Sequence, residues 1–427
     1  MEVHFTEENL LEYIFSPSNL NKAYKQVFSN GGSGGVDKME TDELLPYLQV
    51  HKDELLTSIF QGSYRPNPVR RVDIPKDGGK TRSLGIPTVV DRVVQQAILQ
   101  VLSPIYEQEF SDSSYGFRPR RSCHGALKKV QSYVTAGYKY GVDLDLEKFF
   151  DTVNRSKLIE LLSRRIKDGR VISLIHKYMG SGVMIGHKFE ESVSGVPQGG
   201  PLSPLLSNIM LNELDKELEF RGHKFVRYAD DCIILCKSKR SAERVKISLT
   251  RFIEAKLFLN VNQEKTKVGY IRGMKFLGYS FYVNKGECRL SVHPQSEQKM
   301  KTRLKELTSR SNGLGYERRK TKLSAFIRGW VEYFKYADMK RMLHDTDEWL
   351  RRRLRLCIWK SWKRIKTRIK NLIRCGISKN RAVSHGNARQ GYWRMSGNPV
   401  LTEALCNDNL KRAGYLFMSD YYHKMSS

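Results

Sequence analysis

Two adjacent carboxylates, Asp230 and Asp231, lie between the apolar runs at residues 225–226 and 232–236. Apolar runs on both sides of a short polar turn predict a β-hairpin with the carboxylates at its tip. Paired like charges are costly to hold together unless a cation neutralises them, so this tip favours a divalent metal site. Asp is also common in ordinary turns, and the tetrapeptide at 228–231 alone does not separate the two readings.

A third carboxylate, Asp145, follows an alternating segment that begins at Val142 and predicts a strand running into a helix near residues 152–165. If that strand ends beside the hairpin, three carboxylates meet, which suits the oxygen-ligand preference of Mg²⁺. Asp143 would share the strand face of Asp145, so spacing alone leaves both open. We expect Asp151 to cap the helix that follows.

The chain is strongly basic, with 74 Lys and Arg against 45 Asp and Glu and a formal net charge of +29 in 427 residues. Within residues 299–394, 28 basic side chains stand against 7 acidic ones, so most of the net charge falls in under a quarter of the chain. Such a region predicts salt-dependent attraction to the phosphates of a nucleic acid. A merely solvated helical face would mix the signs more evenly.

The sequence has no run of 18 apolar residues, and its start lacks a basic stretch followed by an apolar one. We therefore expect a cytoplasmic protein without a membrane partner. Its seven cysteines are odd in number and lack paired zinc-ligand spacing, which predicts reduced thiols. The length allows two to four compact units.

Eight short motifs carry a resemblance to a known family. In chain order they are RVDIPK (71–76), RSLGIP (82–87), SYGFRP (114–119), DLEKFFD (145–151), SGVPQGG (194–200), YADD (228–231), FLGY (276–279) and GWVEYF (329–334). Each string is short, but the ordered set resembles bacterial group II intron-encoded reverse transcriptases that are also maturases. Residues 379–427 lack paired Cys and His ligands, so the chain resembles the short, endonuclease-lacking type found in group IIC introns.

The resemblance implies an α+β, right-hand polymerase fold, with fingers and palm on antiparallel sheet and then an α-helical thumb or maturase domain. It places the N-terminal extension and fingers at 1–130, the palm with part of the fingers at 131–292, the thumb at 293–378 and a nucleic-acid-binding tail at 379–427. Three apolar stripes near a 3.6 period predict three thumb helices, the third over residues 350–372. Their basic faces are expected to contact RNA through Arg351, Arg352, Arg353, Lys363 and Arg364.

The family pattern selects Asp145 over Asp143. It implies that Asp145, Asp230 and Asp231 are catalytic and hold two Mg²⁺ ions with the Leu146 carbonyl. A hairpin at residues 69–86 is expected to fold over the nucleotide, and the glycine-rich stretch at 29–35 predicts a mobile loop. The expected dNTP contacts are Lys76, Arg82, Leu146, Phe150 and Gln198, and Gly195, Pro197 and Tyr228 are expected near template and primer.

Phe150 lies five residues after Asp145, where reverse transcriptases carry an aromatic side chain that would collide with a ribose 2′-hydroxyl. RNA-dependent RNA polymerases usually place an acid there, so Phe150 favours deoxynucleotides. Phe149 is expected in the core, although either aromatic could be the packed one. Lys265 or Lys267 is expected near the leaving pyrophosphate.

The function implied is RNA-directed DNA polymerisation by two-metal phosphoryl transfer, together with assistance to intron splicing and retromobility. The expected partners are an RNA template, a DNA primer, dNTPs, the group II intron RNA and target DNA, with monomer or dimer left open. Two alternatives remain: a splicing maturase without polymerase activity, and a related bacterial reverse transcriptase recruited to defence or repair.

Overall fold

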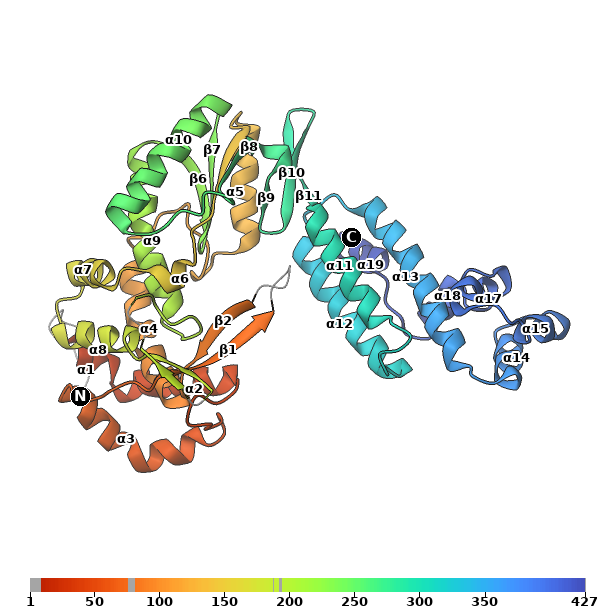
Figure 1. Ribbon diagram of the computed structural model, residues 1–427, viewed down its shortest axis with the longest axis horizontal. Helices are drawn as coiled ribbons and strands as arrows, with labels where there is room; N and C mark the ends of the chain where they lie inside the picture. Colours follow the sequence, from red (N-terminus) through yellow and green to blue (C-terminus); the bar gives the residue numbers. More distant parts are fainter. Residues whose placement is uncertain (1–8, 76–80, 187, 192–193, 427) are drawn as a thin grey trace. The chain divides into compact units, whose positions relative to one another are not determined.

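A computed structural model describes residues 9–75, 81–186, 188–191 and 194–426 (Figure 1). The chain divides into two compact units, Met1–Met274 and Lys275–Ser427. Strands at residues 275–292, which we expected in the palm, cluster with the second unit, and the four expected domain limits stay predictions. Among the described helices, none combines the length and the apolar character needed to cross a membrane.

Helices α1, α2 and α9 of the first unit contact α4 (Val89–Glu107), which is buried along most of its length. This helix starts at Thr88, whose hydroxyl accepts a hydrogen bond from the Asp91 N–H. The other described helices are α1 (Leu10–Ile14), α2 (Pro17–Asn30), α3 (Leu44–Phe60), α5 (Cys123–Thr135), α6 (Phe149–Thr152), α7 (Arg155–Arg165), α8 (Gly169–Met179), α9 (Ser203–Phe220) and α10 (Lys239–Phe252), which a π-helical turn extends over Ile253–Leu257.

A four-stranded antiparallel sheet of order β6-β7-β3-β8 forms the centre of the first unit. Its strands are β3 (Tyr140–Leu144), β6 (Lys224–Tyr228), β7 (Asp231–Cys236) and β8 (Lys267–Tyr270). Helices α5, α9 and α10 pack against it (Figure 1). Strand β7 is buried from Cys232 onward because its apolar run faces helices, so the hairpin predicted from the flanking runs is confirmed.

A second sheet of order β2-β1-β4-β5 contains the other predicted hairpin. Strands β1 (Val69–Pro75) and β2 (Thr81–Ile86) pair antiparallel from Arg70 with Ile86 to Pro75 with Thr81, as the alternation predicted. Strand β4 (Val183–Ile185) pairs parallel to β1 and antiparallel to β5 (Lys188–Glu190). Lys76, an expected dNTP contact, lies outside the described residues.

The stretch at residues 29–35 was predicted to be a loop, and residues 31–35 are one, whereas Ser29 and Asn30 still belong to α2. Two half-buried arginines bind carbonyls of this loop. Arg70 donates from Nε and Nη2 to the Gly34 carbonyl at 3.1 and 2.8 Å. Arg92 donates to the carbonyls of Gly31 and Ser33. The glycine content predicted the absence of regular structure but not these bonds, which come from β1 and α4.

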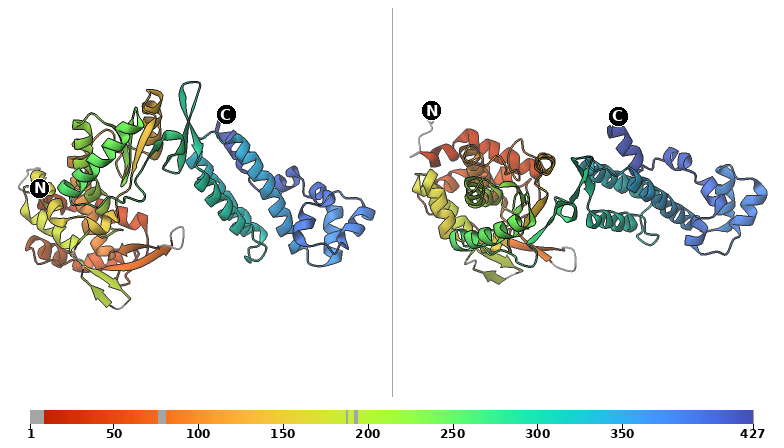
Figure 2. Two further views of the ribbon diagram at one scale, coloured as in Figure 1. Left: turned by 45° about the horizontal axis from the view of Figure 1, so that its top comes forward. Right: turned by 90° about the horizontal axis from the view of Figure 1, so that it is seen from above.

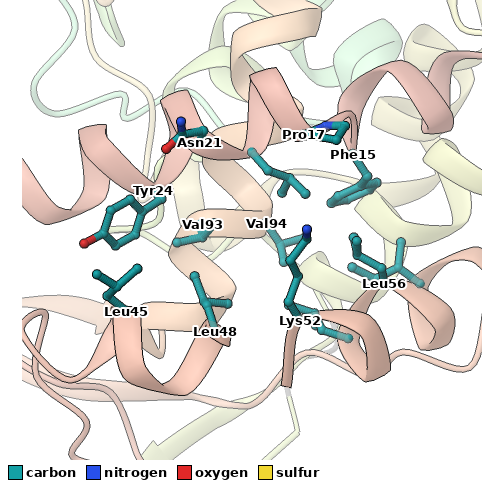
Figure 3. A pocket seen from close by; sticks show the side chains of 13 residues that line it. Phe15, Pro17, Asn21, Tyr24, Leu45, Leu48, Lys52, Leu56, Val93 and Val94 are labelled. Atoms are coloured by element: carbon teal, nitrogen blue, oxygen red, sulfur yellow. The ribbon is translucent and has the colours of Figure 1, made fainter. Parts of the chain in front are cut away.

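An apolar pocket of about 190 Å³ lies between α2, α3 and α4 (Figure 3). Aromatic and aliphatic side chains such as Tyr24, Leu48 and Val94 line it, and Lys52 brings one ammonium group to its rim.

The second unit joins a three-stranded antiparallel sheet to a helical region. The sheet has the order β11-β10-β9, from β9 (Lys275–Phe276), β10 (Tyr279–Asn284) and β11 (Glu287–Val292). Helix α11 packs beside α12, as Figures 1 and 2 show. The helices are α11 (Pro294–Leu307), α12 (Tyr316–Phe334), α13 (Lys340–Ser361), α14 (Ile365–Arg374), α15 (Lys379–Gly386), α16 (Tyr392–Ser396), α17 (Pro399–Ala404), α18 (Asn407–Arg412) and α19 (Met418–Ser426).

The third apolar stripe was predicted to be one helix, and this prediction is wrong. Helix α13 ends at Ser361 and α14 begins at Ile365, so the apolar residues of the stripe are divided between two helices. Arg368, from α14, donates from Nε to the Trp362 carbonyl at 3.0 Å and lies over the Trp359 ring. A side chain from the next helix thus satisfies a carbonyl left open at the end of α13, which a periodicity count does not register.

Candidate active site

The predicted carboxylates reach one edge of the central sheet from two strands. Tyr228 pairs with Asp231, which leaves Ala229 and Asp230 as a two-residue loop at the hairpin tip. On the neighbouring strand, Leu144 pairs with Cys232, so the next residue, Asp145, arrives at the same edge as Asp231. The register therefore brings the three carboxylates to one end of β3 and β7.

A pocket of about 650 Å³ opens at this edge, entirely within the first unit. The strand end, the hairpin tip, the β1–β2 hairpin and the segment after residue 193 all contribute to its wall. The predicted site residues that line it are Arg82, Asp145, Leu146, Phe150, Pro197, Gln198 and Asp230, joined by Lys265. Of the predicted residues that the structure describes in this unit, Asp231, Tyr228 and Gly195 are not among the lining side chains.

The backbone around Leu146 turns one carbonyl away from its pairing partner. Leu146 is bridged to Val261, and the flanking groups make the hydrogen bonds: Glu147 N–H donates to the Asn260 carbonyl, and Asn262 N–H to the Asp145 carbonyl. In this antiparallel pattern the carbonyl of the middle residue points away from the partner strand. Leu146 also lines the pocket, and its carbonyl is not used in this pairing.

Lys265 is the basic side chain beside the carboxylates. Its Nζ lies 3.4 Å from Asp145 Oδ2, and both side chains are partly exposed. Lys267, the alternative considered from the sequence, is in β8 opposite Asp143. The structure thus places Lys265, rather than Lys267, in an ion pair with a predicted metal ligand.

The donors present fit a hard divalent cation that also binds substrate. Asp145 and Asp230 line one pocket and offer carboxylate oxygens. Across the part of the chain that is described, no three Asp, Glu, His or Cys side chains converge to form a complete metal cage. Mg²⁺ is commonly held by one or two carboxylates together with substrate phosphates and water, so two acids suffice for such a site.

Arg82 and Gln198, predicted separately as nucleotide contacts, are joined to each other. Arg82 Nε donates to Gln198 Oε1 at 2.9 Å, and the Gly85 N–H donates to the Gln198 carbonyl at 2.7 Å. The next residue, Gly199, has φ +130°, and a Cβ there would lie 2.5 Å from the Gly85 carbonyl oxygen. Glycine is therefore needed for the segment to lie against β2.

The adjacent aromatics divide as predicted, because Phe149 is 3% exposed in the core whereas Phe150 is half-buried. Val196 N–H donates to the Phe150 carbonyl at 2.7 Å. Gly195 has φ +81°, and a Cβ there would come within 2.5 Å of the same oxygen. Gly195 lies behind the backbone of Phe150, so its expected place near template and primer stays a prediction.

The expected cap at Asp151 is wrong. Asp151 is within α6, and α7 begins after Asn154, whose Oδ1 accepts from the Lys157 N–H at 2.9 Å. The chain makes a short helix and restarts, so the capping residue lies three positions later than the pattern suggested. The Asp151 carbonyl instead accepts from the Ser194 hydroxyl at 3.0 Å.

The basic residues expected to contact RNA fall into two groups. Arg353 donates to Thr308 Oγ1 at 2.6 Å and to two carbonyls at the end of α11. Arg351 lies over the Phe417 ring and Arg352 over the Trp393 ring, both within the second unit. The second group, Lys363 and Arg364, is exposed between α13 and α14. RNA contact stays a prediction for all five.

Sequence reasoning missed Arg227, which is fully buried in β6 directly before the hairpin tip. The signal available was a basic residue inside an apolar strand, since a buried charge requires a partner. Its partner, Asp215, is on α9, and no short-range pattern connects the two positions.

Comparison with known proteins adds independent findings. A family model described as "Reverse transcriptase (RNA-dependent DNA polymerase)" matches residues 74–281, and one described as "Group II intron, maturase-specific domain" matches residues 297–376. The first match covers all the residues that line the pocket except Val69 and Arg71, which precede it in β1.

Two curated relatives match over most of the chain. Protein YkfC of Escherichia coli strain K12 is 36% identical over 339 residues, which are 68% of this chain and 88% of that protein. The group II intron-encoded protein LtrA of Lactococcus lactis subsp. cremoris is 32% identical over 342 residues, 65% of this chain and 57% of LtrA. The chain thus spans a little over half the length of LtrA. Among solved structures, a chain of a partial Cas6-RT-Cas1–Cas2 complex is 28% identical with a TM-score of 0.37, over 60% of this chain and 43% of that one.

Proposed function

Because the chain belongs to the family of group II intron reverse transcriptases and maturases, we propose that it copies RNA into DNA in the pocket between Asp145 and Asp230. The observation that carries this proposal is the shared pocket. It gathers the Asp145 and Asp230 carboxylates, the Arg82–Gln198 pair and Phe150 from four separate segments of the first unit.

We propose Mg²⁺ as the metal, with two ions held by Asp145, Asp230 and the Leu146 carbonyl and with Asp231 as a further ligand. When bound, the ions lower the pKa of the primer 3′-hydroxyl and neutralise charge on the departing pyrophosphate. Two protein carboxylates and the phosphates of a nucleotide together provide the oxygen ligands that this requires.

The remaining residues bind and orient the nucleotide. Arg82, held at Nε by Gln198, presents its guanidinium fork toward a triphosphate, for which a planar fork is well suited. Lys265 lies beside Asp145 and can pair with the pyrophosphate as it leaves. Phe150 lines the pocket as a flat apolar wall, where a ribose 2′-hydroxyl would be crowded and left without a hydrogen-bond partner.

Primer extension tests the proposal directly. The reaction contains an oligo(dT) primer on poly(rA), Mg²⁺, and either dTTP or UTP, with wild type compared with Asp230→Asn. We expect extension with dTTP alone and its loss in the variant, while RNA binding persists because the basic second unit is unchanged. Glu264→Gln, which removes an exposed charge outside the pocket, is the matched control and should extend normally. A folded, RNA-binding wild type that extends nothing would favour a splicing cofactor without polymerase activity.

For the second unit we propose binding to structured intron RNA, to assist splicing and retromobility. The maturase-specific match, residues 297–376, overlaps most of the region at 299–394 that holds most of the net positive charge. Substituting Lys363 and Arg364 with Ser should weaken RNA binding and make it less dependent on salt concentration. A protein that makes fewer phosphate contacts releases fewer counterions when it binds. Arg353→Ser should instead lower the melting temperature. If the binding constants of wild type and the Lys363/Arg364 variant depend equally on salt concentration, these two residues do not contact RNA phosphates.

A further inference from the structure

A buried ion pair lies directly beneath the hairpin tip. Arg227, in β6, and Asp215, on α9, are both fully buried. Arg227 Nε donates to the two Asp215 oxygens at 2.8 and 3.1 Å. A buried pair of this kind adds little to stability compared with an apolar pair of similar volume. Its position next to Asp230 therefore calls for a reason other than holding the fold together.

The same guanidinium also holds the hairpin loop. Arg227 Nη1 donates to the Ala229 carbonyl at 2.9 Å and to Asn208 Oδ1 at 2.9 Å. Ala229 has φ +57°, a left-handed conformation that residues with a Cβ rarely adopt. The loop thus takes an unfavourable backbone shape at the point where Arg227 binds it.

Holding the Ala229 carbonyl constrains the next residue. That carbonyl belongs to the planar peptide group that ends at the Cα of Asp230. When its oxygen is fixed, the plane is fixed, and only the dihedral angles of Asp230 remain to set the direction of the carboxylate. One hydrogen bond from Arg227 therefore acts on the orientation of a predicted metal ligand.

A second layer supports the loop from behind. Asn208 Nδ2 donates to the Gly116 carbonyl at 2.9 Å. Gly116 lies so close to the loop that a Cβ there would come within 2.2 Å of the Ala229 nitrogen. The backbone of Arg227 also pairs with this segment, to the Ser113 carbonyl at 2.9 Å and from the Tyr115 N–H at 2.8 Å. The tip is thus clamped between α9 and residues 113–116.

We propose that Arg227, Asp215 and Asn208 are positioning residues for polymerisation: they fix the Ala229–Asp230 peptide so that the Asp230 carboxylate faces the pocket. The inference rests on the proposed function and extends it to three residues that do not touch substrate. Arginine is required because its fork reaches Asp215, Asn208 and Ala229 together.

The decisive variant is the double substitution Arg227→Met with Asp215→Leu. It removes both charges, so no unpaired charge stays buried, and the fold is expected to survive. The Ala229 carbonyl loses its donor. We expect a melting temperature near that of wild type, a kcat lower by about 10²-fold, little change in the KM for dTTP, and faster hydrogen exchange at the amides of residues 229–231.

Two further variants separate positioning from stability. Arg227→Lys keeps the charge opposite Asp215 but cannot span all three partners, so it should fold and still show a reduced kcat. Arg170→Met breaks ion pairs to Glu12 and Asp168, outside the pocket lining, and should lower the melting temperature at normal kcat.

The outcomes distinguish this inference from the function on which it rests. A wild type that fails to extend a primer refutes the proposed polymerase, whereas the exchange measurement still tests the clamp. Unchanged exchange at residues 229–231 in a folded double variant overturns the inference. A wild-type kcat in either the double variant or Arg227→Lys overturns it as well.

Discussion

Replacing Gly195 with Ala should damage both stability and catalysis by amounts that can be separated. Gly195 has φ +81°, and an added Cβ would lie 2.5 Å from the Phe150 carbonyl oxygen and 2.8 Å from the Asp151 carbonyl. Both are backbone atoms of α6, so relief of the overlap requires the chain to move. The left-handed conformation alone costs about 1–2 kcal/mol for a residue with a Cβ.

Gly222→Ala provides the matched control. Gly222 has φ +71°, and a Cβ there would have no heavy atom within 4 Å. This variant therefore carries the conformational cost without the overlap, about 1–2 kcal/mol or a shift of roughly 2–8 °C in melting temperature. Gly195→Ala carries the same cost plus the displacement of Phe150. The difference between the two variants measures the overlap.

The assay combines thermal unfolding with primer extension on poly(rA), using dTTP and UTP. Gly222→Ala should keep the kcat and the preference for dTTP. Gly195→Ala should lose about 10²-fold in kcat, because a misplacement near 1 Å at a reacting centre can have that effect, and should accept UTP more readily as Phe150 shifts. If both variants behave alike in extension, the contact between Gly195 and Phe150 does not govern the pocket.

Three further predictions concern the same unit. Phe150→Val should raise UTP use relative to dTTP by about 10-fold, measured by paired extension; an unchanged ratio would remove Phe150 as the sugar gate. Lys265→Gln should lower the Mg²⁺ concentration for half-maximal rate by about twofold, since a partly exposed cation no longer competes at Asp145; a rise would contradict this. Hydrogen bonds from the Arg170 side chain lower the pKa of Glu12. At Asp168 burial raises the pKa, but hydrogen bonds from the Arg170 side chain and from the backbone N–H groups of Leu11 and Arg170 together outweigh burial, so this pKa is lowered as well. Both carboxylates therefore stabilise the fold above about pH 4.5. This stabilisation is lost as the pH falls through the lowered pKa values. The difference in melting temperature between wild type and Arg170→Met should therefore be smaller at pH 3 than at pH 6.

Features that depend on neighbours in the sequence could be predicted. The alternation of apolar and polar residues on both sides of the turn that begins at Lys76 predicted the β1–β2 pairing. The apolar runs around Asp230 predicted the β6–β7 hairpin. Each follows from a two-residue period, which a strand with one buried face imposes. The choice of Asp145 over Asp143 needed the family pattern, because both would share one strand face.

Features that depend on partners far along the chain could not be predicted. Arg353 sits in a run of three arginines, which favoured a solvated RNA-binding face, yet its guanidinium binds the end of α11 some 45 residues earlier. Arg227 is bound through Asp215 on another helix, and the end of α13 is satisfied by Arg368 from the helix that follows. A single arginine can serve as a surface cation or as a donor to orphan carbonyls, and only the fold decides which.

The pocket combines few metal ligands with a closely fixed backbone, and this combination bears on how it works. Asp145 and Asp230 are the carboxylates in its lining that the family pattern assigns to metal, too few for a complete protein cage. In contrast, the chain behind Phe150 and Gln198 lies so close to its neighbours that Gly195 and Gly199 leave no room for a Cβ. A rigid frame with an incomplete ligand set is completed by the phosphates of the substrate. Metal and nucleotide should therefore bind cooperatively, since each supplies part of the charge and the ligands that the other lacks.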